Sequence, residues 1–490
     1  MDIIFVSCGF ENLGVEYLSA ALKQKGFSAG LVNIPSLAIA KYSRRIPGLC
    51  KTMDLVVREI ENYHPKAVAF SSNTLDYPYC SQIAEKIKGK QATSVIFGGP
   101  HPTLIPEIVI NNKAVDYVIT GEAESQLPRL AECLLLGKGN IKDIDNLWYK
   151  QNGETKTNAE NPYLIDIDAL PLPDKGLYSD LIKRSGTYNV ISSRGCRYSC
   201  SFCYSDYMNS KFRNFYRRRK PEKVIEELGF MHEKFRFKKV YFFDSNFATD
   251  KDWLDNFLQK YREKINLPFS CEGHVSTFSE AIAGMLRASG CRFIDFGIQT
   301  MSERLRNSVL KRPESNAQIK RALDICEKEG IKFFVDHLFN IPGEQNEDFL
   351  YSGLFYMNYR KLARIKCFNL YYFPQSTISA YAAKNNYIKP EDALAIGKGD
   401  TPAIKKYSFF NKKNFNLIFL ILPVFPLRER KLLFSAKMLK LFGFMPRLSG
   451  LFFHLLAALR HKNYLYLAYM KEKILEHYLF LSGSVKLNEE

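Results

Sequence analysis

Three cysteines in one short segment carry the clearest chemical signal of the sequence. Cys196, Cys200 and Cys203 have the spacing C-x3-C-x2-C and directly follow a predicted strand. Three thiolates on such a turn can hold three irons of a [4Fe–4S] cluster, whose usual ligand set is four cysteines. The next cysteine is Cys271, so one iron would keep an open coordination position. Zinc sites favour paired CxxC units and four ligands, and the sequence has no second pair.

This segment, with the aromatic Phe202 directly before the third cysteine, resembles the fingerprint of the radical S-adenosylmethionine (SAM) superfamily. The resemblance implies that the three cysteines bind the cluster and that its open iron chelates the amino and carboxylate groups of SAM. One-electron reduction would then cleave a C–S bond of SAM and give a 5′-deoxyadenosyl radical. That chemistry belongs to the cofactor, while the protein orients it and excludes water.

Later segments resemble further parts of the same family, in the expected order. Asp244 and Asn246 lie in a segment similar to the second strand, which runs beside the methionyl group. Gln299 ends a segment similar to the fourth strand, where a polar side chain faces the ribose. Ile341 belongs to a loop similar to the one that passes near the adenine. The resemblance therefore implies that these four residues and Phe202 bind SAM, although each alone would also suit a structural role.

Two other features of this region could have functional or structural meanings. Glu272 and His274 on the third predicted strand are candidate substrate contacts, although a core histidine with satisfied hydrogen bonds is the more common outcome. The basic run Tyr216–Pro221 could contact nucleic acid, but charge runs are most often solvated faces, and we expect a local structural role. The catalytic residues cannot be named from the sequence.

The elements that position these residues follow a regular alternation between residues 186 and 385. The predicted strands are Tyr188–Ser192, Val240–Phe243, Phe269–Glu272, Phe293–Ile298, Lys332–Leu338 and Lys366–Tyr372. Intervals of roughly 25 to 50 residues leave room for one helix between each pair. We therefore expect a partial (β/α)6 barrel, the core fold of the resembled family.

Residues 1–145 show a second alternation of short apolar runs and helix-like segments. The predicted strands, each followed by small residues, include Ile3–Ser7, Ala67–Ser71, Ser94–Phe97 and Tyr117–Ile119. Short buried strands separated by helices predict a doubly wound parallel sheet in an α/β domain. Ligands of such folds bind at the carboxyl edge of the sheet, where these small residues would lie.

The same segments resemble the cobalamin-binding domain that is fused ahead of many radical SAM barrels. The resemblance spans nearly residues 1–385 and implies that a corrinoid lies on the carboxyl edge, facing the cluster. The residues that it assigns to cobalamin are Ser71, Ser72, Thr74, Gly98, Gly99, Pro100, Gly121 and Glu122. The D-x-H-x-x-G motif that supplies a cobalt ligand elsewhere is missing, and we do not assign His101 to cobalt. The alternative is a domain that is retained only for packing.

The remaining segments are a linker and a basic tail. Residues 146–185 predict a small hairpin around Asn152-Gly153 and then a linker. Residues 386–490 predict a mainly helical region with apolar stripes at Leu432–Leu441 and Leu451–Leu459. Its longest nearly uncharged run, Phe415–Leu427, is shorter than the ~20 residues that span a bilayer. The tail could pack on the barrel as a cap or lie on an anionic membrane surface.

Composition sets the remaining bounds. The 490 residues suffice for two or three domains, and 46% apolar with 24% charged residues exclude a disordered or collagen-like chain. The net charge of +18 suits a polyanion, an anionic membrane or an anionic substrate. The start of the sequence lacks signal-peptide features, and the eleven cysteines favour reduced thiols, so we expect a cytoplasmic protein, peripheral at the membrane if the tail binds lipid.

With both cofactors, the resemblance implies methylation of an unreactive carbon or of phosphorus in a small-molecule or lipid-like substrate. A one-electron reductant such as a flavodoxin or ferredoxin would be required. One alternative is a cobalamin-associated cyclase or rearrangement enzyme without methyl transfer. A second is an RNA-modifying methylthiotransferase, but Cys8, Cys50, Cys80 and Cys133 lack a ligand motif, so we do not expect nucleic acid as a partner. A non-catalytic corrinoid-handling protein is disfavoured by the intact cysteine triplet.

Overall fold

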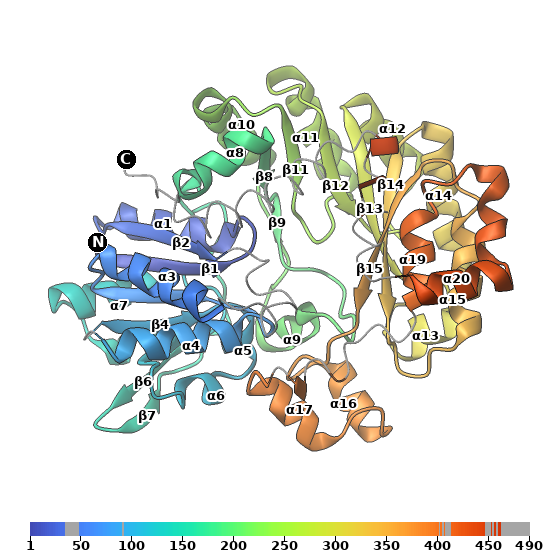
Figure 1. The fold of residues 1–490 in the computed structure, drawn as a ribbon. Helices are drawn as coiled ribbons and strands as arrows, with labels where there is room; N and C mark the ends of the chain where they lie inside the picture. The colour runs from blue at the N-terminus through green and yellow to red at the C-terminus, as the bar shows by residue number, and fades with distance from the viewer. Residues whose placement is uncertain are drawn as a thin grey trace.

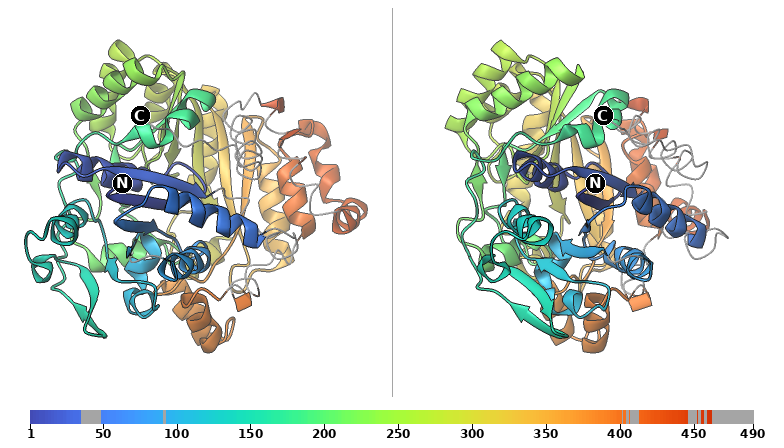
Figure 2. Two further views of the ribbon diagram at one scale, coloured as in Figure 1. Left: turned by 60° about the vertical axis from the view of Figure 1, so that its left-hand side comes forward. Right: turned by 90° about the vertical axis from the view of Figure 1, so that its left-hand side faces the viewer.

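The chain folds around two large β-sheets, which lie on opposite sides of the molecule in Figure 1. The computed structural model describes residues 1–34, 49–90, 93–400 and 413–445, with short stretches at 402–403, 406, 452, 455–456 and 459–461. In both views of Figure 2, the first sheet lies in front of the barrel strands. The α/β fold with a helical carboxyl-terminal region agrees with the fold predicted from the sequence.

The first sheet has seven strands in the order β2-β1-β3-β4-β5-β6-β7. The strands are β1 (Ile3–Cys8), β2 (Ala29–Ile34), β3 (Ala67–Ser71), β4 (Ser94–Gly98), β5 (Tyr117–Ile119), β6 (Leu147–Gln151) and β7 (Glu154–Thr157). Strands β1 to β5 are parallel, whereas β6 and β7 add antiparallel at one edge. The hairpin expected at Asn152-Gly153 is therefore present, but it extends the first sheet instead of standing apart from it.

Helices cover both faces of this sheet, as a doubly wound fold requires. They are α1 (Leu13–Gln24), α3 (Leu49–Asn62), α4 (Tyr77–Lys88), α5 (Pro100–Leu104), α6 (Pro106–Ile110) and α7 (Gln126–Leu136). Alternate residues of β1 point to opposite faces, so Ile3 and Phe5 pack with α1 and α7, whereas Ile4 and Val6 pack with α3 and α4. The chain changes face between β1 and β3, which creates a crevice at their carboxyl ends.

A strap of short elements joins the two sheets. It contains the 3-10 turn η2 (Lys175–Tyr178), followed by α8 (Ser179–Ser185), whereas the 3-10 turn η1 (Ile141–Asp143) precedes β6 within the first domain. Lys175 in η2 is completely buried and contacts Glu11 and Glu16 of the first domain. It also donates a hydrogen bond to the carbonyl oxygen of Asn189 at 2.7 Å. The strap is therefore fixed to both domains by one buried cation.

The second sheet is a partial barrel of six parallel strands in the order β15-β14-β13-β12-β11-β8. The strands are β8 (Thr187–Val190), β11 (Lys239–Phe242), β12 (Phe269–Gly273), β13 (Cys291–Gln299), β14 (Lys332–Phe339) and β15 (Leu362–Asn369). The helices of the barrel are α9 (Tyr204–Lys211), α10 (Pro221–Phe235), α11 (Lys251–Lys264), α12 (Glu280–Ala288), α13 (Glu303–Ser308), α14 (Asn316–Glu329) and α15 (Asn346–Tyr356). A two-stranded ladder of β9 (Ser193–Arg194) and β10 (Arg217–Arg218) follows β8. The six-stranded arrangement predicted from the sequence is confirmed.

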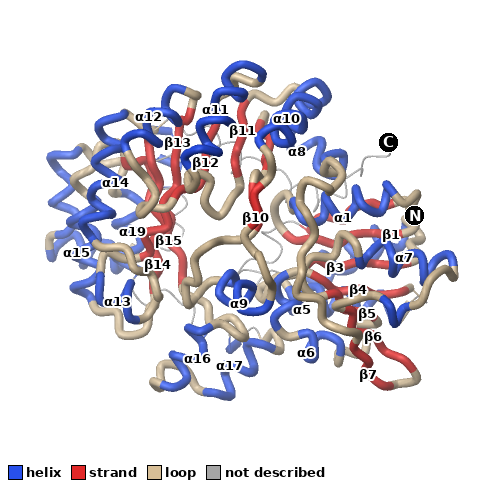
Figure 3. Tube along the Cα trace, turned by 180° about the vertical axis from the view of Figure 1, so that it is seen from behind, coloured by secondary structure: helices blue, strands red, loops and turns tan. Residues whose placement is uncertain are grey.

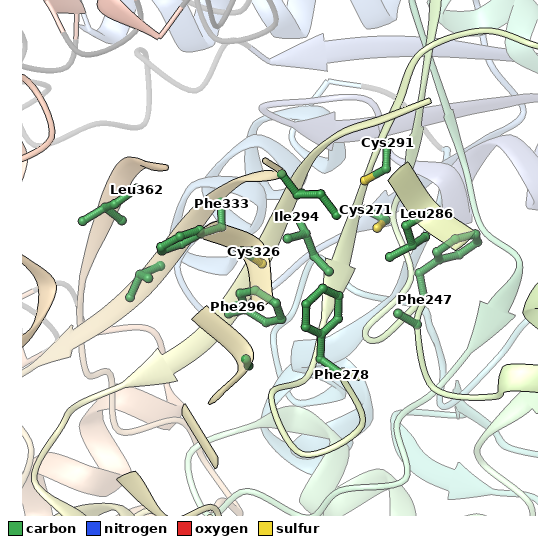
Figure 4. Packing of buried hydrophobic residues seen from close by; sticks show 14 of the residues in the cluster. Phe247, Cys271, Phe278, Leu286, Cys291, Ile294, Phe296, Cys326, Phe333 and Leu362 are labelled. Carbon is green, nitrogen blue, oxygen red and sulfur yellow. The ribbon is translucent and has the colours of Figure 1, made fainter. Parts of the chain in front are cut away.

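The outer face of this sheet packs against the helices and forms the largest apolar core. Figure 4 shows part of it, with Cys271, Ile294 and Phe333 on neighbouring strands and Leu286 on α12. Because side chains of a strand alternate between faces, the intervening residues point into the barrel. The outer face of the sheet is therefore apolar, and the polar residues of the strands face the lumen.

Further helices lie after the last barrel strand. They are α16 (Thr377–Lys384), α17 (Pro390–Gly397), α19 (Lys413–Ile421), the 3-10 segment η3 (Leu427–Phe434) and α20 (Ala436–Phe444). Helix α19 packs against β15 and α15, so this part of the tail caps the barrel. No helix among the described residues is long and apolar enough to cross a membrane. Most of the predicted stripe Leu451–Leu459 lies outside the described residues.

Candidate functional site

The cysteine triplet lies on the loop between β9 and α9, which Figure 3 shows between the two sheets. Cys200 is buried, and Cys196 and Cys203 are half-buried. Burial raises the pKa of Cys196 and of Cys200, the latter to about 11, and the neighbouring Cys203 thiol adds to both shifts. Metal binding must therefore displace the thiol protons. No three His, Cys, Asp or Glu side chains of the described segments surround a position for a single metal ion.

Several contacts fix the shape of this loop. The Asn209 amide donates to the carbonyl oxygens of Cys196 and Tyr198 at 3.1 and 3.3 Å. The Ser201 hydroxyl donates to the carbonyl oxygen of Val309 at 2.7 Å. Gly195 has a φ of +79°, and a Cβ atom there would lie 2.3 Å from the Phe215 carbonyl oxygen. Glycine is therefore required where the chain enters the loop.

The residues predicted to bind SAM surround this loop in different ways. Phe202 and Ile341 pack in one apolar cluster, although they are far apart in the sequence. Asp244 is buried and accepts hydrogen bonds from the backbone amide and hydroxyl of Ser192 and from the hydroxyl of Ser193. Its carboxylate thus holds the start of the cysteine loop. Burial raises the pKa of Asp244 above its ordinary value, although these donors oppose the shift.

Asn246 and Gln299 show features that are typical of ligand-binding positions. Asn246 is only 5% exposed, and neither atom of its amide has a hydrogen-bond partner among the described residues. A buried amide without partners costs free energy unless a ligand satisfies it. Gln299 is the last residue of β13 and Asn340 directly follows β14, and their φ angles are +68° and +67°. Such backbone strain, of order 1–3 kcal/mol per residue, clusters at functional sites. These residues fit a bound polar cofactor such as SAM.

The lumen below this loop contains a buried network of charged groups. Lys366 contacts Asp295 and lies 2.9 Å from an Asp336 oxygen. The Tyr241 hydroxyl donates to Glu272. Burial raises the pKa of Glu272 to about 7, although the nearby Lys366 ammonium opposes this shift. Glu272, a predicted substrate contact, therefore lies in the barrel interior as expected from its strand position.

His274 has a different neighbourhood from the one expected of a substrate contact. Its ring stacks on Tyr198 of the cysteine loop, with centroids 4.0 Å apart. Its Nε2 lies 3.1 Å from a nitrogen of Arg312, and because guanidinium only donates, Nε2 accepts. Burial, reinforced by Arg312, lowers the pKa of His274 to about 4, so the ring is neutral near pH 7. Arg312 and its partner Glu314 were not predicted as site residues.

A cavity of about 510 Å³ lies between the carboxyl edge of the first sheet and the entrance to the barrel. The first domain contributes the ends of β1, β3, β4 and β5, including Ser7, Asn12 and Asn73. The barrel side contributes Ser193, Gly195 and the loop after β11, with Phe243. The cavity therefore adjoins the start of the cysteine loop.

Seven of the eight residues predicted to bind cobalamin line this cavity, namely Ser71, Ser72, Gly98, Gly99, Pro100, Gly121 and Glu122. The Ser72 hydroxyl is buried and has no hydrogen-bond partner among the described residues, which fits a cavity for a polar ligand. Thr74 is not part of the lining, and its hydroxyl lies 3.1 Å from Nδ1 of the buried His101. His101 does not line the cavity either.

Ion pairs across the cavity wall join the two domains. Glu122 binds Arg217 and lies 3.4 Å from Arg194, and Glu124 lies 2.6 Å from Arg194. The Glu122 carboxylate thus has protein partners already, although it lines the cavity. The neighbouring Arg218 lies over the Trp253 ring at 3.7 Å. The basic run therefore has the local structural role that we expected.

The pairings of Arg312 with Cys200 and of Arg217 with Glu122 could not be predicted, because the partners are distant in the sequence. Arg312 and Cys200 are 112 residues apart, and Arg217 and Glu122 are 95 apart. No local spacing links such pairs. Arg304, Arg306 and Lys311 also follow Gln299, so the sequence alone does not distinguish Arg312 from its basic neighbours.

Two family models match the chain in the order that the fold shows. Residues 9–131 match the B12 binding domain, and residues 190–352 match the radical SAM superfamily. The first match begins directly after β1 and covers β2 to β5, and the second covers the cysteine loop and strands β11 to β14 of the barrel. The first family binds cobalamin. The second binds a [4Fe–4S] cluster and SAM.

Individual proteins are also similar to the chain. An uncharacterized methyltransferase of Pyrococcus horikoshii is 28% identical, and the match covers 65% of this chain and 70% of the relative. The bacteriochlorophyllide d C-12(1)-methyltransferase of Chlorobaculum tepidum is 25% identical, and the match covers 53% of each chain. The chain thus spans only about half the length of the second relative.

A solved structure shows the same fold. The radical SAM methyltransferase TsrM of Kitasatospora setae, with cobalamin and a [4Fe–4S] cluster bound, superposes with a TM-score of 0.62 at 18% identity. The match covers 79% of this chain and 78% of that one. From the two domains, their order and this shared architecture, we conclude that the chain is a radical SAM enzyme of the group that carries an amino-terminal B12-binding domain.

Proposed function

We propose that this enzyme transfers a methyl group to an unactivated carbon, or to phosphorus, in a small-molecule substrate. The observation that carries the proposal is the cavity of about 510 Å³, because both domains form its walls. A corrinoid on the edge of the first sheet would face Arg194 and Gly195 at the start of the cysteine loop. The relatives named as methyltransferases support the same choice.

The bound cofactors supply the reactive chemistry, a 5′-deoxyadenosyl radical from SAM and a methyl group carried by cobalamin. The residues of the chain bind and orient them. In this proposal Cys196, Cys200 and Cys203 hold three irons of the cluster. The amide of Asn246 and the strained Gln299 bind SAM, while Phe202 and Ile341 provide an apolar surface. Asp244 acts through Ser192 and Ser193 by fixing the entry to the loop.

Cobalamin, in the same proposal, lies against Ser71, Ser72 and the backbone at Gly98, Gly99 and Gly121. A Cβ atom on Gly99 would lie 3.1 Å from both the amide nitrogen and the carbonyl oxygen of Ser72. The glycine thus lets the ends of β3 and β4 approach closely, and no side chain at this position occupies the cavity.

The substrate that fits the lumen is a small molecule with apolar and polar parts. Phe243 directly follows β11, and Phe368 lies on β15. They are 60% and 46% exposed and offer aromatic surface. Below them, the network of Lys366, Asp295 and Asp336 offers charged and hydrogen-bonding groups. A purely hydrocarbon substrate would leave this network without solvent or ligand partners.

We also propose that the tail contacts an anionic membrane surface. Lys437, Lys440, Leu441 and Phe444 are exposed, and their spacing places them on one face of α20. Phe442, on the opposite face, is buried in the barrel core. An exposed helical stripe that combines lysine with large apolar side chains is typical of interfacial helices. Sedimentation with anionic but not neutral vesicles, lost in Lys437→Glu/Lys440→Glu, would support this contact.

The first experiment is anaerobic reconstitution with iron, sulfide and hydroxocobalamin, followed by metal analysis and an absorbance spectrum. We expect about four iron atoms and one corrinoid per chain. Incubation with SAM and a one-electron reductant, either dithionite or flavodoxin, should then give S-adenosylhomocysteine and 5′-deoxyadenosine. Both products are expected because methyl donation and radical formation each consume SAM.

The control for this experiment is Cys203→Ser, which should retain the corrinoid and lose the iron–sulfur absorbance. Iron without corrinoid would contradict the methyltransferase proposal and leave a radical enzyme whose first domain packs or binds substrate. Formation of 5′-deoxyadenosine without S-adenosylhomocysteine would favour cyclisation or rearrangement instead of methyl transfer.

A further inference from the structure

A buried arginine lies directly beside one of the three cysteines. Arg312 Nη1 donates a hydrogen bond to Cys200 Sγ at 3.5 Å. Both residues are nearly removed from solvent, with 7% of Arg312 and 8% of Cys200 exposed. Hydrogen bonds to the sulfur ligands are one of the factors that set the reduction potential of an iron–sulfur cluster. Arg312 is therefore placed where it can act on the cluster.

The orientation of the guanidinium is set by its other partners. Glu314 accepts from Nε at 2.8 Å and also contacts Nη2. His274 Nε2 accepts from Nη2 at 3.1 Å. These contacts occupy the side of the guanidinium that carries Nε and Nη2 and leave Nη1 for the sulfur. The negative charge of Glu314 thus lies behind the guanidinium, while the positive group faces Cys200.

The segment that carries Arg312 is held in place by a second arginine. Arg306 is completely buried and donates to the carbonyl oxygens of Thr300 and Glu314 at 2.6 and 2.8 Å. Its own carbonyl oxygen accepts from the amide of Arg312 at 2.8 Å. Arg312 is therefore presented by a fixed loop, since these bonds close the chain between residues 300 and 314.

The contacts of His274 lead back to the cysteine loop. Tyr198, between Cys196 and Cys200, stacks on the His274 ring at an interplanar angle of 10°. The Tyr198 hydroxyl and His274 Nδ1 lie 2.8 and 2.7 Å from the Ser276 hydroxyl oxygen. The loop, the histidine and the arginine thus form one connected unit around Cys200.

We infer that Arg312 is a positioning residue for the cluster and that its hydrogen bond to Cys200 raises the cluster's reduction potential. The inference rests on the proposed assignment of Cys200 as an iron ligand. In the step concerned, the cluster takes one electron from the external reductant, passing from the 2+ to the 1+ state, and no bond forms or breaks. The added negative charge is stabilised by a nearby donor that carries positive charge.

The test is an EPR-monitored redox titration, with dithionite, of the reconstituted full chain without SAM. Arg312→Gln and Arg312→Met should shift the midpoint potential to more negative values. Arg312→Lys should give a smaller shift, because a lysine keeps the charge but cannot bind Glu314 and Cys200 together. The matched control is Arg197→Gln, which removes the same charge from the cysteine loop itself, at an exposed position beside Tyr216, and should leave the potential unchanged.

A second variant tests the inference if the arginine variants fail to assemble a cluster. Glu314→Gln removes the negative charge behind the guanidinium and should shift the potential to more positive values. Arg312 variants that keep full iron content and the wild-type potential would overturn the inference, as would Glu314→Gln without a shift. Absence of a cluster in the wild-type chain would instead refute the underlying assignment, so the two failures are distinguishable by iron content.

Discussion

Lys175 Nζ lies 2.8 Å from a carboxylate oxygen of Glu16, and both side chains are completely excluded from solvent. Glu11 contacts the same ammonium, so two carboxylates share one cation. Burial raises the pKa of Glu16 well above its ordinary value, and Lys175 is the main group that opposes this shift. The junction between the strap and the first domain therefore depends on one lysine.

We expect Lys175→Met to lower the free energy of unfolding by about 3–5 kcal/mol, because it leaves buried carboxylates without their counter-charge. Urea unfolding followed by far-UV circular dichroism measures the change. The matched control is Lys23→Met, which removes a half-exposed cation from the 2.7 Å ion pair with Asp174 between α1 and the same strap. That variant should lose no more than about 1 kcal/mol. Equal unfolding midpoints for both variants would show that the buried Lys175 cluster stabilises the fold no more than the half-exposed ion pair of Lys23.

Replacement of any one of Cys196, Cys200 and Cys203 by serine should abolish the cluster. Two thiolates leave too few ligands to retain four irons, so iron and acid-labile sulfide should fall from about four per chain to well below one. Cys133→Ser is the control, since Cys133 lies on α7 in the first domain. The cluster assignment fails if a single variant of the triplet keeps the full iron content and the wild-type EPR spectrum.

Gly99→Val should reduce corrinoid binding while leaving the iron content intact. Gly99 has a φ of +98° and lines the cavity, so a side chain there strains the backbone and meets Ser72. Gly153→Val separates the two effects, because Gly153 also has a positive φ of +81°, but a Cβ atom there would meet no described residue within 4 Å. Bound hydroxocobalamin after gel filtration is the readout. Equal corrinoid content in the two variants would place cobalamin elsewhere.

Much of this arrangement follows from local sequence patterns. The cysteine triplet was predictable because its ligands stand within eight residues of one another, from Cys196 to Cys203. The barrel strands were predictable because each is a short apolar run with a helix-sized interval after it. The last strand was placed too late, at Lys366–Tyr372 instead of Leu362–Asn369, because the apolar residues at 370–372 extend the pattern beyond the hydrogen-bonded ladder.

The unpredicted parts depend on contacts between distant segments. The sequence predicts the hairpin of β6 and β7 but not its partner. Its pairing with β5 makes it part of the first sheet. Glu122 follows a strand end in the way that a ligand contact would, yet its carboxylate binds Arg217 from the other domain. The cobalamin and SAM assignments of individual residues remain predictions until ligands are bound.

Stability should fall on acidification partly because of His337. This residue is completely buried among Tyr356, Phe339 and Phe419, and burial lowers its pKa to about 3. The unfolded chain binds the proton first, so the contribution is full above pH ~6.5 and is lost as the pH falls toward 3. Between pH 6.5 and 5 the loss is about 2 kcal/mol.

His337→Phe should therefore weaken the dependence of unfolding free energy on pH in this range, whatever its effect on stability at pH 7. Urea unfolding at pH 6.5 and 5 measures the difference. His64→Asn, at an exposed position, should leave the slope as in the wild type. An unchanged slope in His337→Phe would mean that another group dominates acid sensitivity.

The ion pairs across the cavity wall also bear on how this architecture can be recombined. Glu122 and Glu124 belong to one domain, and Arg194 and Arg217 belong to the other. A chimaera that took its first 145 residues from a relative would receive new acceptors opposite the old donors. The ion pairs between the two domains would then not form, even if both domains folded. Exchange of the corrinoid module should therefore succeed only when Arg194 and Arg217 of the β9–β10 ladder travel with it, so the crossover point for engineering belongs after β10.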